Sequence, residues 1–276
     1  MSPAAGGPPP ELFERARAMK RGEFSPPPAR DAATIALLRD APDGPEVYLL
    51  RRVRAMAFAG GMHVFPGGSV DPPDAHAALA WAGPPPSAFA QAFSCDEPLA
   101  RALVCAAVRE TFEESGVLLA GRSPQELLAD VSTDEWEAER VALEAREQSL
   151  SELLTRRGLV LRADLLRPFA HWITPEVEPK RFDTRFFVAR VPEGQVCRDA
   201  GSEADRRLWL RPQEALDSGL GMLPPTAVAL AELATHADVE AALAATRTIR
   251  PVLPKLVVGD DDEVAFLLPG DAGYPV

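Results

Sequence analysis

Lysine is scarce in this 276-residue sequence, and long apolar runs are absent. Only three of the 29 basic residues are lysine, and 41 residues are acidic, so the formal net charge is −12. Sequence-independent binding to nucleic acid or to an anionic membrane needs basic surface, so a chain this acidic is not expected to bind either. No apolar stretch approaches the roughly 18 residues of a membrane-spanning helix, so no such helix is predicted.

Cysteine is also scarce, and its spacing excludes two common uses. Cys95, Cys105 and Cys197 are far apart and form no CxxC pair, which argues against a disulfide framework and against a zinc knuckle. The first residues lack a basic segment followed by an apolar one, so no secretory signal is predicted. We therefore expect a reduced, cytoplasmic protein.

Proline is abundant, with 28 residues, and its clusters are expected between elements rather than inside them. Apolar periodicity and turn signals predict helices over residues 11–20, 98–115, 124–157, 212–218 and 225–246. Strands are expected over residues 33–38, 46–52, 60–68, 165–172, 184–189 and 207–210, with a hairpin turn at Asp43–Gly44 after the first. Residues 72–97 are expected to be irregular, and residues 255–268 to add a strand or to wrap the domain.

The order of these elements indicates the fold class. Strands are followed by one central helix, by more strands and then by helices, which is not a regular alternation of strand and helix. A doubly wound dinucleotide fold is therefore not expected, and neither Gly60–Gly61 nor Gly67–Gly68 forms a GxGxxG or phosphate-loop motif. An α/β fold with a mixed sheet between helices fits better.

The most informative group of acidic residues lies at the end of the expected helix 98–115. Glu110, Glu113 and Glu114 would share one helical face, where like charges repel and the helix dipole disfavours anions. Arg109 can neutralise one carboxylate, and a divalent cation with oxygen ligands, Mg²⁺ or Mn²⁺, is the simplest remedy for the rest. A solvated charged face is the alternative. The apolar turns before the cluster indicate a buried helix that opens onto a cleft, and both interpretations stay open on these residues alone.

Two segments together resemble a known motif, the Nudix box GX5EX7REUXEEXGU. They are Gly68 with an acid at Asp74, and the run Arg109-Glu110-x-x-Glu113-Glu114-x-Gly116-Val117. Asp74 stands for the usual glutamate, Thr111 stands for an aliphatic residue, and the seven-residue spacer has become 34 residues, 75–108. A box split at this point, together with residues 57–68, 171–175 and 181–187 around it, resembles the peroxisomal acyl-coenzyme A diphosphatase branch of the Nudix superfamily.

The resemblance covers roughly residues 30–235 and implies a Nudix-type α/β/α sandwich with a mixed β-sheet and helical insertions. We expect the Nudix hydrolase domain over residues 30–235, with an insertion at about 75–100 and a helical elaboration at about 123–160. Residues 1–29 would form an N-terminal helix and a proline-rich lead-in. Residues 236–276 would form a C-terminal helix and a tail that packs on the same domain.

The implied activity is metal-dependent hydrolysis of the pyrophosphate bond of a nucleoside diphosphate that is linked to another group. Coenzyme A or acyl-coenzyme A is the first choice of substrate, and ADP-ribose, a dinucleotide or another nucleotide derivative is the alternative. A Nudix fold kept as a non-catalytic, ligand-sensing module is a third hypothesis, which the intact glutamate set argues against. The expected partner is a small nucleotide substrate, without nucleic acid or membrane, and a homodimer is left open.

The resemblance also assigns roles at the reacting end of the site. Mg²⁺ or Mn²⁺ would be held by Glu110, Glu113, Glu114 and the carbonyl of Gly68. Arg109 would orient Glu113. Glu203, just before the expected strand 207–210, is the first candidate for the general base, Asp205 and Glu178 are weaker, and Glu110 is the alternative. The expected catalytic residues are therefore Glu110, Glu114, Glu203 and Arg109.

Substrate contacts are expected from Arg52, Arg54, Gly67, Arg181 and Arg185. The coenzyme A signature of the superfamily is matched at Arg52, at Gly61 and over residues 65–68, whereas Ala57 stands where an arginine is expected. Arg51, Arg52 and Arg54 cannot all face one side of a strand. An internal pair between Asp183 and an arginine is the alternative for Arg181 or Arg185. His63 and His171 are expected to be packed rather than metal-binding.

Overall fold

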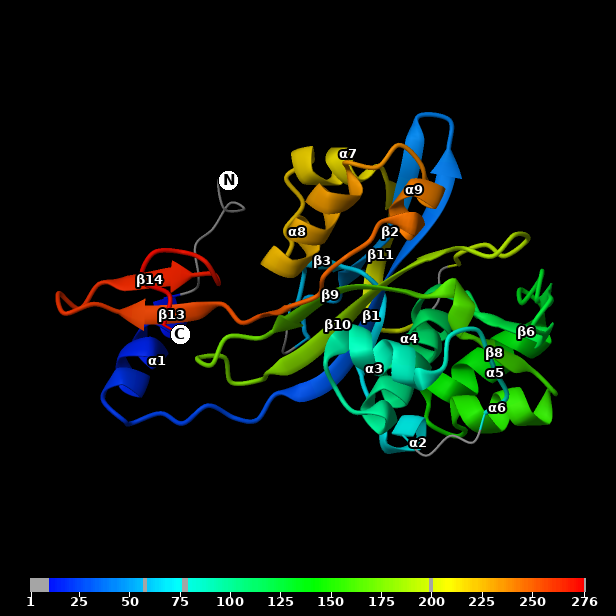
Figure 1. Cartoon of the computed structure of the whole chain (residues 1–276), viewed down its shortest axis with the longest axis horizontal. Coiled ribbons are helices and arrows are strands. Elements are labelled where there is room, and N and C mark those ends of the chain that lie inside the picture. Colours follow the sequence, from blue (N-terminus) through cyan, green and yellow to red (C-terminus); the bar gives the residue numbers. More distant parts are fainter. Residues whose placement is uncertain (1–9, 57–58, 76–78, 199–200, 276) are drawn as a thin grey trace.

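A mixed β-sheet lies at the centre of the computed structural model, which describes residues 10–56, 59–75, 79–198 and 201–275 (Figure 1). Its strands follow the order β11 (Ala204–Leu210), β2 (Gly44–Arg52), β1 (Arg30–Ala41), β10 (Phe182–Arg190), β9 (Arg167–Ile173) and β12 (Pro251–Val252). Short strands β3 (His63–Val64) and β4 (Gly67–Ser69) pair with β2 and β1. The sheet is mixed because β1 is parallel to β10, whereas β1 and β2 are antiparallel.

Strand β1 is buried on both faces, which explains its continuous apolar run. Ile35 and Leu37 pack into one hydrophobic core, whereas Ala36 and Leu38 pack into the other. These alternate positions are fully buried, as the period of two in a strand requires. Two helical layers therefore have to cover the sheet.

Helices α3 (Pro86–Phe93) and α4 (Glu97–Ser115) cover one face of the sheet. The other face is covered by α7 (Pro212–Asp217), α8 (Pro224–Leu233) and α9 (Val239–Ala244) (Figure 1). This arrangement confirms the predicted α/β/α sandwich. It also makes α4, which carries the glutamate cluster, the most buried helix in its layer, since residues 102–109 are all buried.

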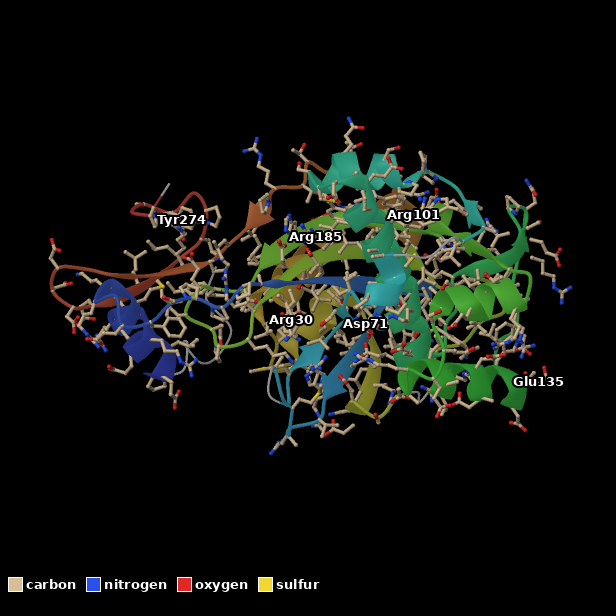
Figure 2. All side chains as sticks on the ribbon, turned by 90° about the horizontal axis from the view of Figure 1, so that it is seen from below. Arg30, Asp71, Arg101, Glu135, Arg185 and Tyr274 are labelled. Carbon is tan, nitrogen blue, oxygen red and sulfur yellow. The ribbon has the colours of Figure 1, made fainter. Side chains whose placement is uncertain are left out.

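Additional elements lie at both ends of the molecule's long axis (Figures 1 and 2). Beside α4 lie α2 (Pro72–Ala75), α5 (Asp134–Glu144), α6 (Leu150–Arg156), the 3₁₀ helix η1 (Ala163–Leu165) and a small sheet of β5 (Trp81–Ala82), β8 (Val160–Arg162), β6 (Ala120–Ser123) and β7 (Glu126–Leu127). At the other end, α1 (Pro10–Lys20) packs on the hairpin of β13 (Lys255–Val258) and β14 (Val264–Leu267). Figure 2 marks the two ends by Glu135 in α5 and Tyr274 after the hairpin.

Three sequence predictions are wrong, each because a helix boundary was misjudged. In the described part of residues 72–97, α2, β5 and α3 replace much of the expected irregular structure, and proline occupies the first turn of α3, where it favours a helix. The expected helix 124–157 is divided into α5 and α6 and begins only at Asp134. The expected helix 225–246 is divided into α8 and α9 because the Asp238 side chain accepts from Ala241 N and starts a new helix.

Most other expected elements are confirmed within a few residues, including the hairpin of β1 and β2 and the N-terminal helix α1. The tail forms strands, β13 and β14, that pair with each other. The boundaries of the Nudix domain at residues 30 and 235 stay a prediction. No helix in the described ranges combines the length and the apolar character needed to cross a bilayer.

Candidate active site

Helix α4 is positioned by its two ends. Its N-cap Asp96 accepts a hydrogen bond from Leu99 N at 2.8 Å. At the other end Gly116 adopts φ 72°, which glycine tolerates, and its N–H donates to Phe112 O at 2.9 Å. The last turn of α4 thus stops where its three glutamates reach β4.

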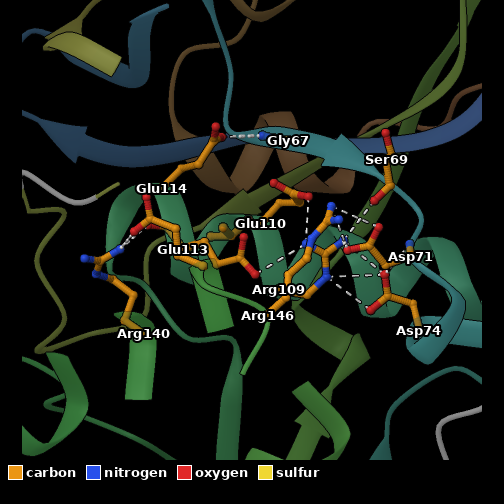
Figure 3. A network of polar contacts seen from close by, with 12 residues as sticks. Gly67, Ser69, Asp71, Asp74, Arg109, Glu110, Glu113, Glu114, Arg140 and Arg146 are labelled. Carbon is orange, nitrogen blue, oxygen red and sulfur yellow. Dashed lines mark hydrogen bonds and ion pairs between the residues drawn. The ribbon is translucent and has the colours of Figure 1, made fainter. Parts of the chain in front are cut away.

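Two glycines of β4 approach these glutamates closely. The N–H of Gly67 donates to the carboxylate of Glu114 at 2.7 Å (Figure 3). A Cβ at Gly68 would collide with the carboxylate of Glu110, so the absence of a side chain permits this approach. The structure therefore brings together the two halves of the predicted box, although they are separated by a long insertion.

Arg109 ties the cluster to the segment after β4. Its Nη1 donates to Glu110 at 2.8 Å and to Glu113 at 3.3 Å, and its Nη2 donates to Asp74 at 3.0 Å and to Ser69 O at 2.8 Å (Figure 3). Arg109 and Asp74 are 8% and 3% exposed at their side chains. The geometry fits the predicted orienting role of Arg109, and Asp74 holds the guanidinium from the opposite side.

The cluster holds more negative charge than Arg109 can balance. Burial raises the pKa of Glu110, and the charges of Asp74 and Glu203 raise it further. Burial and the charge of Glu110 raise the pKa of Glu113 to about 7. Burial and Glu110 also raise the pKa of Glu114 well above its usual range, although Gly67 N–H and Arg52 oppose this. Each shift has the sign expected for carboxylates that are buried close together.

The donor atoms of the cluster fit a hard divalent cation. Carboxylates of Glu110, Glu113 and Glu114, with carbonyls of the Gly67–Gly68 elbow nearby, supply only oxygen, which Mg²⁺ and Mn²⁺ prefer. As the side chains stand, no three His, Cys, Asp or Glu residues of the described chain form a ready metal site. Arg109 lies between Glu110 and Glu113, and Glu114 is turned to Gly67. A cation would therefore draw these carboxylates away from their present partners.

Glu203 lies close enough to the cluster for its charge to raise the pKa of Glu110 and of Glu114, although burial is the largest cause for both. Its carbonyl accepts from Val53 N at 2.9 Å, which fixes it at the end of β2. Its side chain is 56% exposed and forms an ion pair with Arg52 at 2.9 Å. The charges of both residues influence the pKa of Glu114, for which burial is the larger cause. The structure thus places a carboxylate and a guanidinium beside the glutamate cluster.

Arg52 and Arg51 point to opposite faces of β2. Tyr48 and Leu50, which alternate with Arg51 on the strand, belong to the core that contains α4, so Arg52 lies on the α4 side. The Nε of Arg52 is buried and has no hydrogen-bond partner in the described part of the chain. Arg51 pairs instead with Asp205 at 2.6 Å, which places that weaker base candidate on the other face.

The remaining predicted residues lie further out. Arg54 is exposed, and its side chain lies against Gly61; Ala57 lies outside the described residues. Burial raises the pKa of Glu178, and the nearby charge of Arg15 in α1 lowers it. Neither residue forms a hydrogen bond or an ion pair with the glutamate cluster in the described part of the chain.

Arg181 and Arg185 bind protein groups. Arg181 donates to Thr174 O at 3.1 Å and to Pro27 O at 2.9 Å. Arg185 forms ion pairs with Asp31 at 2.6 Å and with Asp183 at 3.0 Å, so the internal pair proposed from the sequence is present. Their role in substrate binding stays a prediction.

Both histidines singled out in the sequence are packed, as predicted. His63 and His171 are 4% and 6% exposed. His63 Nδ1 lies 3.2 Å from Gly221 O, and His171 contacts Asp183.

The sequence did not reveal two residues of α5 that contact the site. Arg140 Nη1 donates to Glu113 O at 2.9 Å, and Glu144 accepts from Ser202 N at 2.7 Å (Figure 3 shows the first contact). In the sequence, Arg140 and Glu144 have the spacing of an ordinary surface pair on a helix. Their partners are distant in sequence, so nothing local indicated these contacts.

The fold and the site together define a class of enzyme. An α/β/α sandwich whose buried helix carries Arg109, Glu110, Glu113 and Glu114 against a glycine elbow is that of a Nudix hydrolase. The family model of the NUDT19 Nudix domain matches residues 82–225. The chain belongs to this family, and it is a Nudix pyrophosphohydrolase.

Similar proteins agree with this assignment. The acyl-coenzyme A diphosphatase NUDT19 of Gallus gallus is 28% identical over 309 residues, which cover 89% of this chain and 80% of that protein. The putative nudix hydrolase 7 of Caenorhabditis elegans is 28% identical and covers 83% of this chain and 69% of that protein. A crystal structure of a NUDIX hydrolase from Alicyclobacillus acidocaldarius is 32% identical, with a TM-score of 0.69, and covers 80% of this chain and 98% of that one. The predicted resemblance to the acyl-coenzyme A diphosphatase branch is confirmed.

Proposed function

We propose that the chain hydrolyses the diphosphate bond of coenzyme A or of an acyl-coenzyme A. The observation that carries the proposal is that two features lie side by side. One is the glutamate cluster, which offers only oxygen atoms, and the other is Arg52, whose buried Nε has no hydrogen-bond partner in the described chain. Glu110 and Glu114 contact the Gly67–Gly68 elbow, and Arg52 Nε is buried without a partner in the described chain. The relative named acyl-coenzyme A diphosphatase, which is 28% identical, supports the choice of substrate.

The acidic and basic residues have separate roles in the proposed reaction. A divalent cation at Glu110, Glu113 and Glu114 would neutralise the diphosphate and lower the pKa of an attacking water. Arg109 keeps Glu110 and Glu113 oriented through its two hydrogen bonds. Arg52 Nε donates to a phosphate oxygen, which satisfies a donor that is otherwise buried without a partner.

Glu203 accepts the proton of the attacking water in this proposal. In the structure its carboxylate is held by Arg52 at 2.9 Å. A diphosphate at Arg52 Nε shares the positive charge of the guanidinium whose Nη2 binds Glu203, so substrate binding weakens this ion pair and makes the carboxylate a better proton acceptor. Water adds across the P–O–P bond, and the products are two phosphate monoesters, 3′,5′-ADP and a 4′-phosphopantetheine compound.

A hydrolysis panel with Mg²⁺ or Mn²⁺ tests the substrate. It contains coenzyme A, an acyl-coenzyme A, 3′-dephospho-coenzyme A, ADP-ribose, NADH and a diadenosine polyphosphate. We expect the highest kcat/KM on coenzyme A or its acyl ester. The kcat/KM for 3′-dephospho-coenzyme A should be lower by one to two decades, because the charged hydrogen bonds to the 3′-phosphate are lost. This loss corresponds to about 1.5–3 kcal/mol. Glu114→Gln is the control, and it should lose activity by orders of magnitude while it stays folded.

Two results of this panel contradict the proposal in different ways. Higher kcat/KM on ADP-ribose or a dinucleotide would move the substrate to another nucleotide derivative and keep the enzyme class. Activity that survives in Glu114→Gln would show that the glutamate cluster is not the site of hydrolysis.

A further inference from the structure

Arg140 of α5 caps the end of the glutamate-bearing helix. The last carbonyls of a helix have no partner inside the helix, and Glu113 O receives the Nη1 of Arg140 at 2.9 Å. The guanidinium is almost completely buried, with 6% of the side chain exposed. A cation at this end also interacts favourably with the helix dipole. Helix α5 therefore fixes the turn of α4 that carries Glu113 and Glu114.

Glu144, one turn further along α5, holds the segment that leads to Glu203. Its Oε2 accepts from Arg140 at 2.8 Å, and its Oε1 accepts from both N and Oγ of Ser202 at 2.7 Å. Gly201 packs against the same end of α4, since a Cβ there would lie 3.3 Å from Glu113 O. One continuous set of hydrogen bonds thus joins Glu113, α5 and Ser202.

We propose that Arg140 and Glu144 are positioning residues that set the distance between the glutamate cluster and Glu203. This inference rests on the proposed role of Glu203 as the proton acceptor. Ser202 immediately precedes Glu203, so the two hydrogen bonds to Glu144 restrict where the Glu203 backbone lies. The helical elaboration would then belong to the catalytic apparatus, because it supplies these contacts.

The test uses Glu144→Ala, since loss of the buried Arg140 could simply unfold the chain. We expect kcat to fall about tenfold, with KM for the substrate within about twofold of wild type, because substrate contacts are kept. Glu137→Ala is the matched control. Glu137 lies on the same helix and binds the same guanidinium at 2.6 Å, but no hydrogen bond links it to Ser202, so kcat should stay within about twofold.

The same substitution in the Glu203→Gln protein separates a positioning role of Glu144 from a purely structural one. In Glu203→Gln the proton acceptor is already removed, so adding Glu144→Ala should lower kcat by no more than about twofold. If the two substitutions multiply their effects, or if Glu144→Ala alone keeps kcat within twofold, the positioning role is overturned.

Amide hydrogen exchange keeps the inference independent of the substrate. The Ser202 amide should exchange at least about tenfold faster in Glu144→Ala than in wild type and in Glu137→Ala, since its acceptor is lost only there. Equal exchange in all three proteins would overturn the inference. A wild-type chain that is inactive on the whole panel would instead contradict the proposed function, and the exchange comparison would still decide whether Glu144 holds Ser202.

Discussion

A single guanidinium lies among the carboxylates at the centre of this site. Arg109 donates hydrogen bonds to three carboxylates, those of Asp74, Glu110 and Glu113, and Glu114 is bound only through Gly67 N among the contacts of the described chain. Burying several carboxylates around one cation opposes folding, because like charges in a low-dielectric region repel. This excess of negative charge favours a metal cation, so the same arrangement that weakens the metal-free fold supports the proposed chemistry.

The stability of the metal-free protein should therefore depend on Glu113. Its pKa is raised from 4.5 to about 7 in the fold, so between these values the folded chain binds a proton that the unfolded chain does not. The free energy of unfolding then falls as pH rises through this window. Glu113→Gln lacks this titration, so in chelator its stability relative to wild type should increase from pH 5 to pH 8.

Urea denaturation of both proteins at pH 5, 6, 7 and 8 in EDTA measures this difference. Comparing the variant with wild type at each pH cancels the carboxylates whose pKa is lowered elsewhere, such as Glu137 and Asp183. A difference that stays flat or shrinks with pH would show that Glu113 is ionised in the metal-free fold throughout.

At the scale of single elements, local signals located α4 and its active face. Proline at the start, apolar turns and a glycine after the last turn are local to this segment, so the sequence alone indicated the extent of the helix to within a residue. The glutamate spacing then placed three carboxylates on one face. The contact of Arg140 with Glu113 O could not be found in this way, because it depends on how α5 packs against α4.

Strand β4 gives a sharp test of how two adjacent glycines differ. A Cβ at Gly67 would lie 2.5 Å from Ala33 O in the buried strand β1, which cannot move easily. A Cβ at Gly68 would meet the flexible carboxylate of Glu110. We therefore expect Gly67→Ala to lower the free energy of unfolding by about 1–3 kcal/mol, as overpacking does. Gly68→Ala should keep its stability and lose at least about tenfold in kcat/KM.

Thermal denaturation and steady-state kinetics on the two variants measure both effects, and each variant is the control for the other. Activity retained in Gly68→Ala would mean that the contact between the elbow and Glu110 is not needed for catalysis. An equal loss of stability in both variants would remove the distinction between the two glycines.

At the scale of the whole molecule, the three hydrophobic cores formed by the described residues differ in size. Two large cores lie on the two faces of the sheet, and a small one joins α1 to the C-terminal hairpin through Leu12, Ala16, Val177 and Leu256. The order of strands and helices indicated a mixed sheet between helices, and the resemblance to the Nudix box implied the sandwich. The pairing of α1 with β13 was not predictable, because it joins the two ends of the described chain and no local pattern encodes such a contact.

The unequal cores predict that two C-terminal truncations differ sharply. A chain that ends at Pro254 loses β13 and β14 but keeps β12 on the sheet, so it should fold and keep kcat/KM within about twofold. Its melting temperature should fall by a few degrees, since Leu256 leaves the small core and Leu268 leaves the edge of a large one.

A chain that ends at Ala234 also loses α9, whose Val239 and Ala242 are fully buried against the sheet. Removing these side chains should cost at least about 3 kcal/mol and leave an unstable protein. Circular dichroism melting and the hydrolysis assay compare the two chains with wild type. A folded but inactive chain ending at Pro254 would contradict this division, because it would tie the distant hairpin to the chemistry at Glu110 and Glu114.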